Sequence, residues 1–169
     1  MGIGRQLRAI VLLPGMAAVG VPALLVVMSG ADPGWGLPAP AAIALGIAGA
    51  ALILVGLRLW AETVRLFAAV GKGTLAPWDP TRKLVVQGPY RRVRNPMISA
   101  VAFVLLGEAA ILGSPPLLVW LAAFVLVICI YIPLVEEPGL VKRFGAKYDD
   151  YRRAVPRWIP RRRPWVEGV

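Results

Sequence analysis

The stretch of sequence that decides the fold runs from residue 97 to residue 135 and reads MISAVAFVLLGEAAILGSPPLLVWLAAFVLVICIYIPLV. Its two apolar segments, 97–112 and 117–135, flank Gly113-Ser114-Pro115-Pro116, which are residues that end helices and form turns. A helix that crosses a membrane needs about 20 apolar residues, within a range of about 17–25. The second segment meets that length and the first falls just short of it. The stretch therefore predicts a tight hairpin of two membrane-spanning helices.

Two further apolar stretches precede this hairpin, at about 7–28 and 41–60. The first could be a signal peptide, but its apolar run is longer than the roughly 7–15 residues of a signal-peptide core, and more apolar stretches follow it. We expect it to be a retained helix. The predicted fold is an all-α integral membrane protein with about four transmembrane helices, a cytoplasmic loop and a C-terminal amphipathic helix.

The composition supports this class. The chain has 169 residues, of which 58% are hydrophobic and 17% charged, whereas soluble domains average roughly 45–50% apolar and about 25% charged residues. An ordinary soluble domain and a disordered chain are both excluded. The chain has no histidine and a single cysteine, Cys129. These counts exclude a histidine general base, a histidine-rich metal site and a disulfide within the chain.

The net charge of +10 comes from 19 Lys and Arg against 9 Asp and Glu. Every basic residue lies before the first apolar stretch, between the second and third, or after the fourth, apart from Arg58 near the end of the second. Segments rich in Lys and Arg stay on the cytoplasmic side of a membrane. We therefore expect both termini in the cytoplasm and contacts with anionic lipids there. No nucleic-acid-binding motif accompanies the charge, so nucleic acid is not an expected partner.

Two adjacent carboxylates, Glu136 and Glu137, stand before Pro138 at the predicted end of the fourth helix. Negative charge there opposes the helix macrodipole, which favours cations at a C-terminus. Two explanations stay open: the pair neutralises nearby arginines, or it binds a positively charged ligand. The candidate arginines are Arg91, Arg92 and Arg94. A third carboxylate, Glu108, lies inside the third apolar stretch, where it is either bonded within the bundle or part of a site.

Local patterns predict three further features. Glycines and prolines favour turns and a short extended piece over 71–96, with Asn95 as the N-cap of the third helix and Pro96 in its first turn. The run 139–155 predicts one amphipathic helix on the membrane surface. Its shared apolar face consists of Leu140, Phe144, Tyr148 and Tyr151. Small residues at Ala42, Gly46 and Ala50 predict a packing face on the second helix.

The order of several motifs resembles one known superfamily. Gly88-Pro89-Tyr90 and Arg94-Asn95-Pro96-Met97 lead into the hairpin, Glu136-Glu137-Pro138 follows it, and Phe144-Gly145, Tyr148, Tyr151, Val155-Pro156 and Ile159-Pro160 come after. This order resembles the integral-membrane methyltransferases, which include isoprenylcysteine carboxyl methyltransferases and phospholipid N-methyltransferases. The resemblance covers residues 71–160, the expected cofactor-binding region of a single membrane domain 1–169. Residues 1–70 would be its N-terminal two-helix scaffold.

The resemblance implies an enzyme that moves the methyl group of S-adenosylmethionine to a lipophilic or lipid-linked acceptor at the cytoplasmic membrane boundary, in a bacterial or archaeal cell. The cofactor's sulfonium and ammonium would suit a carboxylate at the helix end. No metal is expected. The implied cofactor-binding residues are Lys83, Leu84, Val85, Tyr90, Asn95, Pro96, Met97, Ile98 and Glu136. The implied catalytic residues are Asn95, Glu136 and Glu137.

The chain departs from the superfamily pattern at three positions. Asn95 replaces a histidine, Ile98 replaces a tyrosine, and Ile132 stands where an arginine would hold a prenylcysteine carboxylate. The last difference argues against a classical prenylcysteine carboxyl methyltransferase. An alternative from another class is a non-catalytic membrane scaffold that binds anionic lipid through the basic tail, in particular through Arg161, Arg162 and Arg163.

Overall fold

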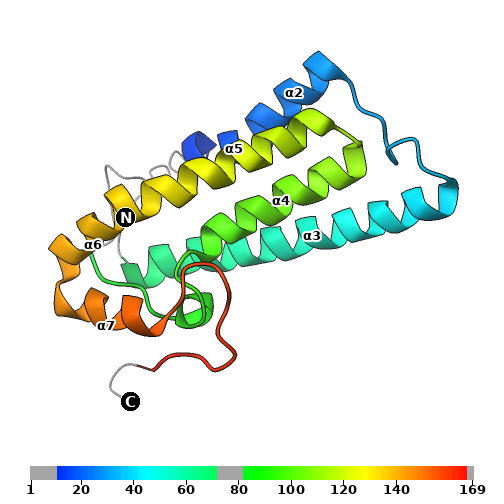
Figure 1. Ribbon diagram of the computed structural model, residues 1–169. Helices are drawn as coiled ribbons and strands as arrows, with labels where there is room; N and C mark the ends of the chain where they lie inside the picture. The colour runs from blue at the N-terminus through cyan, green and yellow to red at the C-terminus, as the bar shows by residue number, and fades with distance from the viewer. Residues whose placement is uncertain (1–10, 72–81, 167–169) are drawn as a thin grey trace.

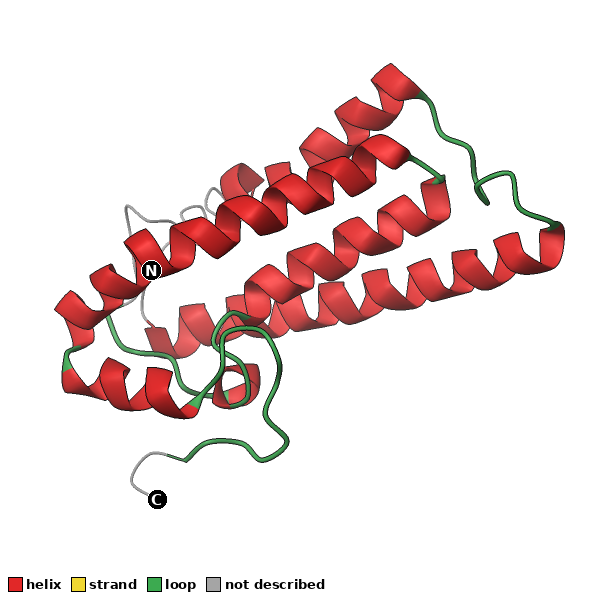
Figure 2. Cartoon of the chain, in the orientation of Figure 1, coloured by secondary structure: helices red, strands yellow, loops and turns green. Residues whose placement is uncertain are grey.

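A computed structural model describes residues 11–71 and 82–166 (Figure 1). Over these residues the structure contains helices, turns and loops but no strand (Figure 2), so the all-α prediction is confirmed for them. The elements are η1 Val11–Gly20, α2 Val21–Ser29, α3 Ala39–Leu66, η2 Phe67–Gly71, η3 Gly88–Arg91, α4 Pro96–Leu112, α5 Pro115–Tyr131, η4 Ile132–Glu136, α6 Glu137–Phe144 and α7 Ala146–Ala154. The predicted hairpin is present as α4 and α5, joined at Gly113 and Ser114.

Two continuous helices are long and apolar enough to cross a membrane. One runs through α3 and η2, over Ala39–Gly71, and the other through α5, η4 and α6, over Pro115–Phe144. The helices over Pro14–Ser29 and Pro96–Leu112 are apolar but shorter. All four apolar stretches of the sequence are thus helical where the structure describes them, and the third is as short as its sequence indicates.

Helices α3 and α4 pack closely because glycine replaces side chains where they touch. A Cβ atom added to Gly49 would lie 2.8 Å from the carbonyl oxygen of Gly107, and one added to Gly56 would lie 2.8 Å from that of Ala100. The small-residue face predicted at Ala42, Gly46 and Ala50 is wrong, since a Cβ on Gly46 would meet nothing within 4 Å. The contact face follows the seven-residue spacing of Gly49 and Gly56, which keeps one side of a helix against its partner.

The helix that begins at Pro115 does not end at Pro138, contrary to the prediction. It passes through the π-helical η4 and continues to Phe144. In η4 the amide of Glu137 donates to the carbonyl of Ile132, five residues back. This wider turn removes the clash that a proline ring makes with the preceding helical turn. The break occurs instead at Gly145, which has φ +57° and ψ −136°.

The predicted amphipathic helix 139–155 is therefore two helices, α6 and α7, on either side of Gly145. Its four apolar residues still gather in one cluster, in which Tyr148, Tyr151 and Val155 are buried and Leu140 and Phe144 pack against them. Leu84, Val86 and Trp165 cover the same cluster from two other segments. The apolar face thus packs against other segments of the chain.

Candidate functional site

One end of the bundle brings together three segments that are distant in sequence: the loop before α4, helix α6 and the C-terminal tail (Figure 1). The tail, 155–166, is bound to the loop by backbone hydrogen bonds. The Arg94 amide donates to Pro156 O over 2.9 Å, the Arg161 amide to Arg92 O over 2.9 Å, and the Trp165 amide to Arg91 O over 2.8 Å. This docking fixes the loop that carries most of the predicted cofactor-binding residues.

Tyr90 lies in the turn η3 and is buried, with 7% of its surface exposed. Its ring packs against Phe67 with a centroid distance of 5.7 Å, and its carbonyl accepts a hydrogen bond of 2.7 Å from the Tyr151 hydroxyl. Burial raises the pKa of Tyr90 well above its ordinary value, and the charges of Tyr151 and Glu136 raise it further. Two consequences follow: the phenol stays protonated, and Glu136 lies within electrostatic range of it.

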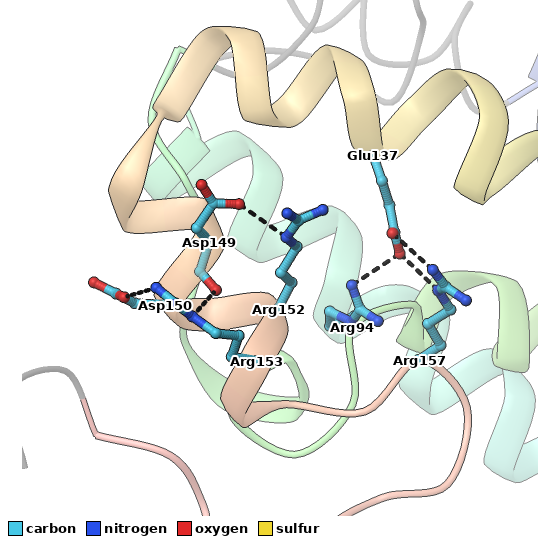
Figure 3. Close-up of polar contacts among 7 residues, drawn as sticks. All are labelled: Arg94, Glu137, Asp149, Asp150, Arg152, Arg153 and Arg157. Carbon is cyan, nitrogen blue, oxygen red and sulfur yellow. Dashed lines mark hydrogen bonds and ion pairs between the residues drawn. The ribbon is translucent and has the colours of Figure 1, made fainter.

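Glu137 is the buried partner of two arginines (Figure 3). Its Oε1 accepts from Arg94 Nη1 and from Arg157 Nε, each over 2.8 Å, and its Oε2 accepts from Arg157 Nη2 over 2.9 Å. The apolar part of the helix ends at Val135, so these charges lie beyond the membrane-spanning segment. Burial alone would raise the pKa of Glu137, but the hydrogen bonds and charges of Arg157 and Arg94 outweigh it and lower the pKa below its ordinary value.

Glu136 differs from its neighbour. Its surface is exposed, but the protein around its base raises the pKa of the carboxyl by desolvation, and the charge of Glu137 raises it further. No ion pair or hydrogen bond engages this carboxylate within 11–71 and 82–166. Consecutive residues of a helix point about 100° apart, so the two carboxylates face different surroundings. The proposed conflict with the macrodipole is wrong because the helix continues past both residues. Pairing with arginines is confirmed for Glu137 and Arg94.

Arg91 and Arg92 do not pair with either glutamate, so that part of the prediction is wrong. Their guanidinium groups bind the tail: Arg91 Nε donates to Trp165 O over 2.7 Å, and Arg92 Nη1 donates to Arg162 O over 3.1 Å. Carbonyl groups of the tail, and not the glutamates, therefore accept the hydrogen bonds of these two arginines.

The remaining predicted residues line the approach to α4. Asn95 is the N-cap by position, as predicted, but makes no side-chain capping bond. Its Nδ2 instead donates to Arg157 O over 3.4 Å. Of the others, Val85 and Pro96 are buried, Lys83 is exposed, and Leu84, Met97 and Ile98 are half-buried. The structure thus gathers the predicted residues of 83–98 and both glutamates at one end of the bundle.

Sequence reasoning missed Arg157 and the tail around it. The only local signal is that Arg157 stands between Pro156 and Trp158, a charged residue in a segment otherwise made of apolar residues and prolines. Its partner lies 20 positions away in the chain, on another element. A spacing rule for helices or strands relates residues within one element and does not find such a pair.

The structure also tests whether these residues suit S-adenosylmethionine. The cofactor carries two positive groups, and an exposed carboxylate without a cation beside it is a suitable partner for one of them. Among the residues that the structure describes, Glu136 meets this condition, and Tyr90, whose pKa its charge raises, is a protonated hydroxyl. Half-buried apolar side chains at Leu84 and Ile98 can cover an uncharged part of a ligand. The residues present therefore fit the cofactor.

Comparison with known proteins identifies the class. A family model described as phospholipid methyltransferase matches residues 45–147. The chain therefore belongs to the phospholipid methyltransferase family, which confirms the resemblance to membrane methyltransferases. Neither a curated protein nor a solved structure matches the chain. Family membership supports an enzyme that methylates a lipid, and together with the two long apolar helices it indicates a membrane protein.

The matched region begins within α3 and ends within α7. It includes both glutamates, the loop of Tyr90 and the glycines at which α3 contacts α4. The tail, 155–166, which contains Arg157, lies beyond it.

Proposed function

We propose that the chain transfers the methyl group of S-adenosylmethionine to a lipid or lipid-linked acceptor at the cytoplasmic boundary of the membrane. The observation that carries this proposal is Glu136, an exposed carboxylate that pairs with no cation within 11–71 and 82–166 and whose charge acts on Tyr90, in a chain of the phospholipid methyltransferase family. The loop, the start of α4 and Glu136 would together hold the cofactor. When bound, the cofactor supplies an electrophilic methyl group.

The chain's own residues would then orient the reactants, since in-line methyl transfer depends mainly on orientation and exclusion of water. Glu136 would bind a positive group of the cofactor, and Tyr90 would donate a hydrogen bond. Lys83, Leu84, Val85, Asn95, Pro96, Met97 and Ile98 would complete the cofactor-binding site. Asn95, Glu136 and Glu137 remain the proposed catalytic residues, with Glu136 the one whose carboxylate is free to accept a proton from an amine acceptor.

Binding of S-adenosylmethionine tests the proposal directly. The full chain is reconstituted in lipid nanodiscs and titrated with S-adenosylmethionine by calorimetry. We expect saturable binding by the wild type and a loss of at least about tenfold in affinity for Glu136→Gln, because a hydrogen bond between charged groups is worth about 1.5–3 kcal/mol. Asp150→Asn is the matched control, since Asp150 is an exposed carboxylate that pairs with Arg153. Absence of binding by the wild type would refute the function.

We also propose four membrane spans with both termini in the cytoplasm. The support is the charge distribution: the loops at residues 30–38 and 113–114 carry no Lys or Arg, whereas the end bearing α7 carries many. In a Cys129→Ser background, Ala31→Cys and Asp150→Cys are labelled with an impermeant maleimide in sealed right-side-out vesicles. We expect labelling at position 31 and none at position 150 until the vesicles are opened. The reverse pattern would contradict the orientation.

A further inference from the structure

A single carboxylate, that of Glu137, joins three segments of the candidate site. It lies at the start of α6, and its two arginine partners come from the loop before α4 and from the tail. Arg157 binds it with two parallel hydrogen bonds, of 2.8 and 2.9 Å. Bidentate contacts of this kind fix the orientation of the two groups as well as the distance between them. We call Arg94, Glu137 and Arg157 the clamp.

We propose that Arg157 is a positioning residue for the cofactor site. Through Glu137 it sets the orientation of the adjacent Glu136 relative to the loop that carries Tyr90, so that the cofactor's positive group meets a carboxylate already in place. This inference rests on the proposed function, and it assigns a role to a residue outside the family match.

The contacts of Arg157 reach both sides of the candidate site. Its guanidinium holds α6 through Glu137, and its carbonyl accepts the Asn95 amide at the start of α4 over 3.4 Å. Arg94, whose side chain completes the clamp, donates its own amide to Pro156, the residue before Arg157. The relative position of α6 and the start of α4 therefore depends on Arg157 together with the direct ion pair between Arg94 and Glu137.

Docking of the tail does not itself require the Arg157 side chain. The three backbone hydrogen bonds between tail and loop, and the contact of Trp165 with Tyr151 at a centroid distance of 5.8 Å, involve other groups. Removal of the guanidinium should thus leave the tail in place and release α6 from it. This separation allows a positioning role to be distinguished from a role in tail attachment.

A double-mutant cycle on S-adenosylmethionine affinity tests the inference, using the full chain in nanodiscs. We expect Arg157→Met and Glu137→Gln each to weaken binding by about 5- to 150-fold, the range of typical coupling between sites. Because Arg157 acts through Glu137, the double variant should bind little more weakly than Glu137→Gln alone. Arg153→Met is the matched control, since Arg153 pairs with Asp150 away from the site and should bind as the wild type does.

Hydrogen exchange gives a readout that a purely structural role would not move. If the clamp strengthens cofactor binding, cofactor binding must strengthen the clamp by the same factor. We therefore expect S-adenosylmethionine to slow exchange at the amides of α6, the helix that Arg157 holds through Glu137, in the wild type. In Arg157→Met the slowing should be reduced in proportion to the lost affinity.

Arg157→Lys provides a second variant if Arg157→Met does not fold. Lysine keeps the charge but cannot form the bidentate contact. The affinity of this variant for S-adenosylmethionine should therefore fall between those of the wild type and Arg157→Met. Wild-type affinity in both Arg157 variants, with the wild type binding S-adenosylmethionine, would overturn the inference and leave the proposed function standing. Failure of the wild type to bind would overturn both.

Discussion

The two ends of the bundle hold the segments around α4 in place with different kinds of contact. At one end, residues 30–38 cover the C-terminus of α4: Trp35 Nε1 lies 3.2 Å from the carbonyl oxygens of both Ala109 and Ala110, and the Asp32 amide donates to Leu112 O over 3.0 Å. These carbonyls belong to the last turn of the helix, where most carbonyls lack a partner within the helix, although that of Ala109 also accepts from the Gly113 amide over 3.1 Å. At the other end, the loop before α4 is held by the clamp and by the tail.

The difference separates a structural end from a candidate functional end. Neutral donors satisfy the carbonyls at the Trp35 end. At the clamp end a buried carboxylate is neutralised by two arginines, while its neighbour Glu136 pairs with no cation in the part of the chain that the structure describes. A buried ion pair adds little net stability compared with apolar packing. The presence of such a buried pair at the clamp end therefore favours a role in positioning charged groups over a role in stability.

Glu137→Ala should have the largest effect on stability. It leaves Arg94 and Arg157 facing each other without a counter-charge, and removal of one member of a buried ion pair typically costs about 3–5 kcal/mol. The expected loss lies near the lower end of that range because the Arg157 side chain is 41% exposed. The free energy of unfolding in nanodiscs or mixed micelles measures it. A loss no greater than that of Asp150→Ala would contradict the assignment of Glu137 as the centre of the clamp.

Acidification should loosen the clamp end before the Trp35 end. The folded pKa of Glu137 lies below its ordinary value, so its contribution to stability is present above about pH 4.3, the unfolded pKa of Glu. It is lost as the pH falls through the folded pKa. Hydrogen exchange should then rise first at the amides of Arg94 and Arg161. The hydrogen bonds of Trp35 do not titrate, and simultaneous loosening of both ends would contradict the comparison.

The fold was predictable to the extent that it follows local patterns. Apolar length predicted the helices and Gly113 the hairpin, whereas the helix end predicted at Pro138 was wrong because the π-helical turn of η4 accommodates the proline. The order of motifs pointed to Tyr90, Asn95 and Glu136, and the structure gathers them. The clamp was not predictable, since the pairing of Glu137 with Arg157 depends on the path of the tail, which no period in the sequence encodes.

Trp35→Phe tests the neutral end and should cost about 1 kcal/mol, the net value of an ordinary hydrogen bond. The ring is kept but the indole N–H is lost, so Ala109 and Ala110 lose a donor. The loss should not change with salt or pH, and binding of S-adenosylmethionine should stay as in the wild type. Weakened cofactor binding in this variant would show that the two ends are coupled and would contradict a purely structural role for the Trp35 end.

Arg153→Met should have the smallest effect on the free energy of unfolding, and it compares an exposed ion pair with the buried one of Glu137. Arg153 pairs with Asp150 over 2.8 Å, but the two side chains are 74% and 64% exposed, and exposed ion pairs contribute about 0.2–1 kcal/mol or less. The small loss should disappear in high salt because solvent-exposed charges are screened, whereas the effect of Glu137→Ala should largely remain. The same unfolding measurement in low and high salt compares them. If both losses vanish together, burial does not distinguish the clamp from an ordinary surface pair, and the special role of Glu137 fails.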